Sequence, residues 1–278
     1  MELGVLVGFE KLDNFEQHFA NLCSCGFSTC QLCSWHPDLW TDENVEMIKG
    51  LLKKYNVRIS AFWCGWEGPC GWNLHEGPLC IGLIPQEFRL MRMKNLCDGA
   101  DFAKKLGVTD VITHMGFIPE NPADPVYRSV CVSIRYVAEH LKANGQNLLF
   151  ETGQETPLTL LRCINDVGTD NLGINLDTAN LILYGKGNPV DALDVIGKYV
   201  RNMHAKDGVF STDGMKLGEE KRLGDGVVDF VKLFEKLKAL NYDSYVTIER
   251  EIDGEEQIAD VMYAKKFLED IIADVYGK

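Results

Sequence analysis

The sequence predicts an α/β protein with a single domain at 1–278, a closed (β/α)8 TIM barrel. Short apolar runs rich in β-branched residues recur along the chain, and a segment with helical spacing follows each of them. Eight such units fit into 278 residues, close to the length that a closed barrel of eight strands and eight helices needs. An open doubly wound sheet is the alternative fold, but the segment after the first strand lacks the G-x-G-x-x-G phosphate loop.

The predicted strands are nearly continuous apolar runs, as expected for parallel strands whose two faces are both buried. They fall at residues 2–7, 28–32, 58–63, 110–114, 147–151, 172–177, 200–204 and 245–249.

The helices between the strands have recognisable starts. Residues 42–55 place apolar side chains on one face, behind Thr41 as the N-cap. Thr156 and Asn188 each precede a proline, which predicts a capped helix start with proline in its first turn. Further helices are expected at 86–106, 127–143, 228–240 and 255–275, with Gly107 as the C-cap of the first of these.

One connection is unusually long, at about residues 64–85 after the third strand. It contains Trp66, Trp72 and five glycines. Connections of this length inside a compact domain are usually functional, and one that follows a barrel strand lies on the C-terminal rim. We therefore expect it to form a lid or wall of the functional site.

The charge balance limits the partners of the protein. With 28 Lys and Arg against 41 Asp and Glu, the formal net charge is −13, which disfavours nucleic acid. No basic segment precedes an apolar run at the N-terminus, and no apolar stretch approaches the ~18 residues of a membrane span. We expect no membrane association and a cytoplasmic location.

Ten cysteines suit a reducing compartment, because a chain of this size needs no disulfide framework. The group Cys23, Cys25, Cys30 and Cys33 resembles a zinc motif in composition. Its two pairs are only four residues apart, whereas zinc ribbons and fingers usually separate them by a dozen or more. Buried core cysteines are the favoured interpretation.

Polar residues end five successive predicted strands, and the C-terminal strand ends are where barrel enzymes carry their reactive groups. These residues are His114, Glu151, Asp177, His204 and Glu249. Each alone has a structural explanation, such as a salt bridge to Lys206. Three carboxylates at one rim would repel one another without a cation, so together with the His204 imidazole they predict one divalent site. Mn²⁺, Mg²⁺, Co²⁺ and Zn²⁺ all suit these ligands.

The motifs at 150–152, 175–180, 203–207, 223–226 and 248–251 resemble those of the xylose isomerase-like TIM barrels. They are most similar to the sugar phosphate isomerase/epimerase branch, which includes ketose 3-epimerases. The resemblance implies that the four ligands named above bind one divalent metal. It also implies that the two glutamates among them, at 151 and 249, are catalytic and exchange a proton from opposite sides of the substrate.

Several positions depart from the epimerase pattern. Asn180 stands where those enzymes carry a histidine, and Pro157 stands where they place a substrate-binding glutamate. The candidate substrate-binding residues are His114, Asn180, Lys206, Trp66, Arg222 and Glu155. Aromatic residues at the ends of the second and third strands are expected to form an apolar wall against a sugar; they are Trp35, Phe62, Trp63 and Trp66.

The sequence thus predicts a divalent-metal-dependent sugar or sugar phosphate isomerase or epimerase that acts through an enediolate. A sugar lyase or dehydratase on the same scaffold, or a non-catalytic sugar-binding barrel, are the alternatives. The apurinic endonucleases of the same superfamily are disfavoured because their additional histidines are missing. The expected partner is a small carbohydrate, and related barrels often pair, which leaves a homo-oligomer open. Phosphate contacts from Arg89, Arg92 or Arg222 are also left open.

Overall fold

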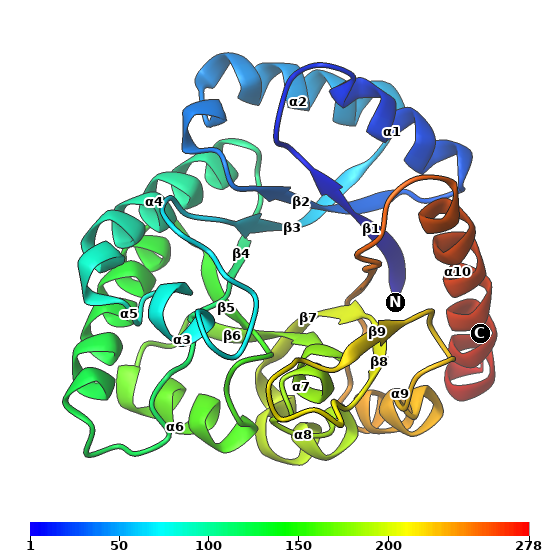
Figure 1. The fold of residues 1–278 in the computed structure, drawn as a ribbon. Coiled ribbons are helices and arrows are strands. Elements are labelled where there is room, and N and C mark those ends of the chain that lie inside the picture. Colours follow the sequence, from blue (N-terminus) through cyan, green and yellow to red (C-terminus); the bar gives the residue numbers. More distant parts are fainter. Residues whose placement is uncertain (278) are drawn as a thin grey trace.

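Eight parallel strands close into a barrel in the computed structural model, which describes residues 1–277 (Figure 1). The barrel strands are β1 (Glu2–Gly8), β2 (Thr29–Ser34), β3 (Arg58–Cys64), β4 (Asp110–Thr113), β5 (Asn147–Glu151), β6 (Leu172–Asp177), β7 (Val200–Ala205) and β10 (Tyr245–Ile248). Their order around the barrel is β1-β10-β7-β6-β5-β4-β3-β2, and every neighbouring pair is parallel. The predicted (β/α)8 fold is confirmed.

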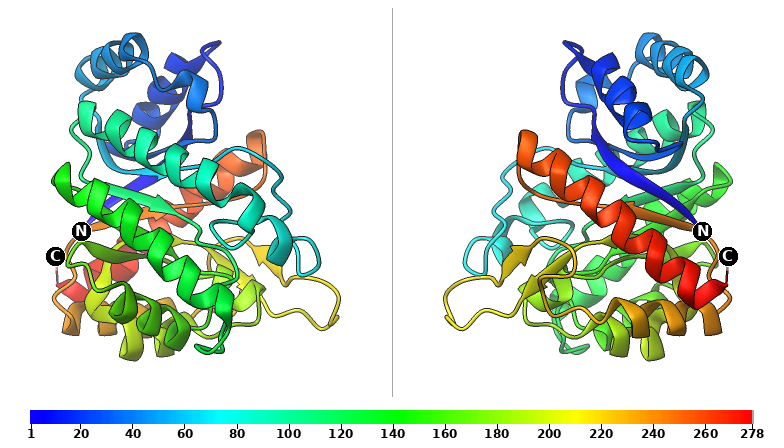
Figure 2. Two further views of the ribbon diagram at one scale, coloured as in Figure 1. Left: turned by 90° about the vertical axis from the view of Figure 1, so that its left-hand side faces the viewer. Right: turned by 90° about the vertical axis from the view of Figure 1, so that its right-hand side faces the viewer.

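Helices surround the barrel on all sides (Figures 1 and 2). They are α1 (Phe15–Ser24), α2 (Asp42–Tyr55), α4 (Gln86–Lys105), α5 (Pro125–Ala143), α6 (Pro157–Val167), α8 (Pro189–Ile196), α9 (Phe230–Ala239) and α10 (Glu255–Tyr276). The expected caps are formed: the Thr41 hydroxyl accepts the Asn44 N–H at 3.2 Å, and the Asn188 side chain accepts that of Val190 at 2.8 Å. Capping satisfies N–H groups that have no partner within the helix.

Because side chains alternate between the two faces of each strand, the apolar core is divided into two clusters. A large apolar layer fills the space between barrel and helices, and a small cluster of Ala61, Trp63, Ile112 and Leu149 is separate from it. Because successive side chains point to opposite faces, Leu149 and Glu151 share the inner face of β5. The inner face therefore changes from apolar to charged at the C-terminal mouth.

The structure also contains short elements that have no periodic pattern in the sequence. They are the helices α3 (Gly77–Cys80) and α7 (Asn180–Leu183), two 3₁₀ turns (Pro37–Leu39 and Gly197–Tyr199) and an antiparallel hairpin of β8 (Asp207–Val209) and β9 (Glu219–Lys221). The hairpin and the segment 65–85 project from the same side of the barrel (Figure 2). Within residues 1–277, no helix has both the length and the apolar character that crossing a membrane requires.

Candidate active site

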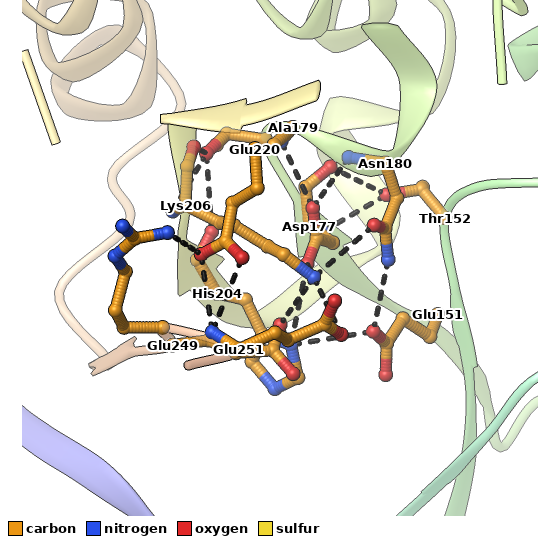
Figure 3. A network of polar contacts seen from close by, with 12 residues as sticks. Glu151, Thr152, Asp177, Ala179, Asn180, His204, Lys206, Glu220, Glu249 and Glu251 are labelled. Carbon is orange, nitrogen blue, oxygen red and sulfur yellow. Dashed lines mark hydrogen bonds and ion pairs between the residues drawn. The ribbon is translucent and has the colours of Figure 1, made fainter. Parts of the chain in front are cut away.

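Four polar side chains converge at the mouth of the barrel. Glu151 and Asp177 end β5 and β6, His204 lies in β7, and Glu249 follows β10. One ligand atom from each lies within 4.8 Å of the others. His204 Nδ1 lies 3.3 Å from Glu151 Oε1, 3.5 Å from Asp177 Oδ2 and 3.0 Å from Glu249 Oε2 (Figure 3). Closure of the barrel therefore brings together groups that are far apart in the sequence.

Gln31 fixes the orientation of the His204 ring. Its side-chain oxygen lies 2.6 Å from Nε2, so it accepts the proton on that nitrogen and leaves Nδ1 facing the carboxylates. Burial opposes a charge on His204, but the carboxylates of Glu151 and Glu249 raise its pKa well above the usual value. Gln31 was not predicted to be a functional residue. Its only signal in the sequence is an amide side chain in the middle of a buried strand.

Two of the three carboxylates, those of Asp177 and Glu151, are each held through one oxygen. Asp177 Oδ1 accepts the backbone N–H groups of Ala179 at 2.9 Å and Asn180 at 2.7 Å, at the start of α7. Burial raises the pKa of Asp177 to about 7. Glu151 Oε2 accepts the indole N–H of Trp63. The remaining oxygens of these two carboxylates are left to face the other ligands.

The two glutamates have lowered pKa values despite their burial. For Glu151, burial acts to raise the pKa, and the His204 and His114 imidazoles outweigh it. For Glu249, burial also acts to raise the pKa, but Lys206 and His204 lower it well below the usual range. Both groups are therefore ionised near neutral pH.

The donor set fits a divalent cation. His204 Nδ1, Asp177 Oδ2 and Glu249 Oε2 are buried and have no hydrogen-bond partner. Buried polar atoms without partners are costly, and three of them turned toward one another are explained by an ion between them. Carboxylate oxygens with one imidazole nitrogen suit Mg²⁺, Mn²⁺, Co²⁺ or Zn²⁺.

Lys206 lies directly beside this cluster and is 1% exposed. Its ammonium group lies 2.8 Å from Glu251 Oε1 and 3.4 Å from Glu249 Oε2, and it donates to Asn180 Oδ1 at 3.3 Å (Figure 3). Burial acts against its charge, yet Glu249 and Asp177 raise its pKa well above the usual value. Asn180 thus connects Lys206 with Glu151, to which its Nδ2 donates at 3.4 Å.

A cavity of about 400 Å³ opens over the cluster. Trp35, Trp63 and Trp72 form much of its wall, with the ring centroids of Trp35 and Trp63 4.9 Å apart and those of Trp35 and Trp72 6.0 Å apart. Trp72 comes from the long segment after β3, so this segment contributes to the wall. The cavity is of a size and character typical of small-molecule sites.

The structure brings only some of the expected substrate-binding residues to this cavity. His114 and Asn180 line it, and Lys206 lies just behind the lining. Trp66 is buried, with its ring centroid 5.0 Å from that of Trp35, and donates to Thr113 at 3.3 Å instead of lining the cavity.

Three other side chains expected near the substrate lie elsewhere. Arg222 pairs with Asp225 at 3.0 Å and lies over the ring of Tyr263. Glu155 is buried outside the cavity lining, and its carboxylate oxygens have no hydrogen-bond partner. Phe62 does not belong to the aromatic wall, because strand alternation turns it away from Trp63 into the outer apolar layer.

Two arginines considered for phosphate binding instead hold the segment 65–85. Arg92 is fully buried under Trp66 and donates to the carbonyls of Cys80 and Gly82 at 2.7 Å and of Pro69 at 2.8 Å. Arg89 donates to the carbonyls of Leu83 and Ile84 at 2.5 and 2.6 Å, and to Ser129. Both guanidinium groups are therefore used in hydrogen bonds to backbone carbonyls of the segment 65–85.

The protein is thus a (β/α)8 barrel whose C-terminal mouth carries a carboxylate and histidine cluster that could hold a metal ion. The sequence profile of the family described as "Xylose isomerase-like TIM barrel" matches residues 19–271. The chain therefore belongs to the xylose isomerase-like TIM barrel family.

Known proteins support this membership. A xylose isomerase domain protein from Planctomyces limnophilus is 30% identical and superposes with a TM-score of 0.93, over 100% of this chain and 99% of the other. A D-tagatose 3-epimerase-like protein shares the fold, with 21% identity and a TM-score of 0.77 over 100% and 99% of the two chains.

Two curated relatives match over shorter regions. An uncharacterised protein of Methanocaldococcus jannaschii is 26% identical over 69% of this chain, and an inosose dehydratase of Geobacillus thermodenitrificans is 29% identical over 39%. The matches span 66% and 42% of the lengths of these two relatives.

Proposed function

We propose that this protein is a divalent-metal-dependent sugar isomerase or epimerase that acts by proton transfer through an enediolate. The observation that carries the proposal is that the ionised carboxylates of Glu151 and Glu249 reach the cavity from different strands and both contact the same imidazole nitrogen. Family membership and the fold shared with the 3-epimerase-like protein support it.

The cation would be held by Glu151, Asp177, His204 and Glu249. When bound, it would supply positive charge that stabilises negative charge developing on two adjacent substrate oxygens. Its ligands are pre-positioned by Gln31 and by the N–H groups at the start of α7.

Proton transfer falls to the two glutamates. An ionised carboxylate can remove the proton next to a carbonyl and later release it to solvent, and the second glutamate can take up a proton from solvent and return it from its own side of the cavity. Return to the same carbon on the opposite face gives an epimer, whereas return to the neighbouring carbon gives an isomer. Trp63 holds Glu151 through its indole N–H, and Lys206 lies beside Glu249, so each glutamate has a fixed direction.

A dehydratase is the second candidate. It would use the same base together with an acid that protonates a departing hydroxyl group. His114 lines the cavity with Nε2 3.5 Å from Glu151 Oε1, which is a suitable place for such an acid. The similarity to inosose dehydratases adds weight to this candidate.

Solvent exchange tests the proposal before the substrate is known. Free and phosphorylated ketoses are incubated with the protein and Mn²⁺ in deuterium oxide, and the recovered sugars are weighed by mass spectrometry. Deuterium incorporation without loss of water supports an isomerase or epimerase, and loss of water identifies a dehydratase. Sugar binding without either change would overturn the proposal in favour of a non-catalytic sugar-binding barrel.

Glu249→Gln is the matched variant, because it keeps the size of the side chain and removes the basic carboxylate. We expect exchange to fall about 10² to 10⁴-fold, the range of general base catalysis. Glu256→Gln, on the exposed first turn of α10, removes the same charge away from the site and should retain full exchange. Full exchange in Glu249→Gln would refute the assigned role.

A further inference from the structure

The cavity is lined by acidic groups. Four carboxylates contribute to its lining, from Glu10, Glu151, Glu249 and Glu251. Among residues 1–277, no lysine or arginine contributes to it. A ligand in this cavity therefore meets aromatic rings and negative charge.

Lys206 lies beside the cavity, and its ammonium group already has partners. It donates a hydrogen bond to Asn180 Oδ1 at 3.3 Å and forms ion pairs with Glu251 Oε1 at 2.8 Å and Glu249 Oε2 at 3.4 Å. Glu251 lines the cavity and Lys206 does not. A substrate anion that pairs with the ammonium group would therefore compete with the Glu251 carboxylate.

Other basic side chains that sequence reasoning considered for phosphate are committed elsewhere. Arg89 and Arg92 hold backbone carbonyls of the segment 65–85, and Arg222 pairs with Asp225 outside the cavity. Lys11 lines an adjoining groove between α1 and α10, which shares Glu10, Glu249 and Glu251 with the cavity, but Lys11 itself does not contribute to the cavity lining. None of these positions provides a phosphate contact over the metal cluster.

The net charge of the site determines whether a phosphorylated sugar can bind favourably. When Lys206 and a bound dication are set against the four lining carboxylates and Asp177, the site keeps a net charge of about −2. A phosphate ester would bring roughly two further negative charges into a site whose lining, within residues 1–277, holds no lysine or arginine. Burying an unpaired anion beside like charges is strongly unfavourable, whereas the C–H face of a neutral sugar packs well on tryptophan.

We propose that the cavity binds an unphosphorylated, uncharged sugar. Glu251 contributes to this selectivity because its carboxylate forms an ion pair with Lys206 and so competes with a phosphate group for the ammonium group. This inference rests on the proposed function and narrows its substrate class. Glu251 is suited to this task because its N–H donates to the carboxylate of Glu220 at 3.1 Å, which holds its backbone, while its side chain is 61% exposed. Glu251 is thus a specificity-determining residue at the edge of the cavity.

Ligand selectivity is measured by quenching of tryptophan fluorescence, because three indoles line the cavity. The metal-loaded protein, with Mg²⁺, is titrated with free ketohexoses and with their 6-phosphates, and inorganic phosphate is added as a competitor. We expect the free sugars to bind at least about tenfold more tightly than their phosphates, and phosphate not to compete. Equal or tighter binding of the phosphates, or binding of no free sugar, would overturn the inference.

Glu251→Ala tests the residue itself, with Glu256→Ala as the matched control on the exposed start of α10. Removal of the Glu251 carboxylate frees the Lys206 ammonium group from this partner and removes one negative charge. The ratio of the affinities for free and phosphorylated sugars should therefore fall about tenfold or more. The control should keep the wild-type preference. An unchanged preference in a folded Glu251→Ala protein would exclude the role of Glu251.

The outcomes also separate this inference from the proposed function. A protein that prefers free sugars but exchanges no substrate proton would refute the isomerase while leaving the inference intact. A protein that exchanges protons equally fast on free and phosphorylated ketoses would refute the inference alone.

Discussion

The side-chain oxygen of Gln31, on β2, lies 2.6 Å from Nε2 of His204, on β7. The two strands are not neighbours in the barrel, so this hydrogen bond crosses its interior. It leaves Nδ1 of the imidazole turned toward the three carboxylates. A residue with no catalytic chemistry of its own thereby determines which nitrogen faces the three carboxylates.

Substitution of Gln31 by Leu should weaken metal binding. Loss of the acceptor allows the ring to reorient, and removal of such a partner typically costs 10 to 100-fold in affinity. Titration calorimetry with Mn²⁺ measures the effect. Gln31→Glu keeps an acceptor at the same place and should retain more of the affinity than Gln31→Leu. Wild-type affinity in the Leu variant would show that the ring is oriented by other contacts.

Removal of divalent ions should lower the thermal stability of the protein. Ion binding to the folded state at a hundredfold excess over Kd adds about 2.7 kcal/mol to the free energy of unfolding. Asp177→Asn retains the acceptor for Ala179 and Asn180 but weakens the ligand, so the Tm of this variant should respond less to Mn²⁺. Differential scanning with and without EDTA compares the two proteins. Equal responses would place the ion elsewhere.

Glu155 should make stability depend on pH. Burial raises its pKa from 4.5 to about 8, so between these values the native protein keeps a proton that the unfolded chain releases. The free energy of unfolding then falls as pH rises, by at most ~1.4 kcal/mol per pH unit, and this contribution levels off below pH 4.5 and above about pH 8. Glu155→Gln has no such proton. Urea unfolding from about pH 5.5 to 7.5 should show a flatter profile for the variant; parallel profiles would contradict this.

Arg92→Leu should loosen the cavity wall. Its guanidinium group satisfies the carbonyls of Cys80, Gly82 and Pro69, and a buried acceptor left without a partner costs about 1–3 kcal/mol. We expect a lower Tm and faster proteolytic cleavage between residues 65 and 85. Arg128→Leu, at an exposed position on α5, is the control and should behave as wild type. Unchanged proteolysis in the Arg92 variant would show that the segment holds itself in place.

The barrel strands and most helices were predictable because their signals are local. Continuous apolar runs between capped helices mark buried parallel strands, and Thr41, Thr156 and Asn188 cap helices where expected. The hairpin of β8 and β9 and the helix α3 escaped prediction because elements of three or four residues carry no period. These short elements are held by contacts with distant parts of the chain.

The positions of individual side chains around the cluster were also not predictable from local sequence. Glu155 was expected at the substrate because it lies near Pro157, the position at which the resemblance implies a substrate-binding glutamate, but its carboxylate is buried outside the cavity lining. Phe62 and Trp63 are neighbours in sequence and lie on opposite faces of β3. Which face is the inner one follows from closure of the barrel.

The sequence by itself determined the eight strand and helix units and the polar residues that end the strands. Apolar runs, helix caps and strand ends depend on residues that are close together in the sequence. Only the tertiary structure decided which of these groups meet. The contacts of Gln31 with His204 and of Glu251 with Lys206 join segments 173 and 45 residues apart, respectively. Their geometry exists only once the barrel has closed, because closure fixes the register and facing of every strand at the same time.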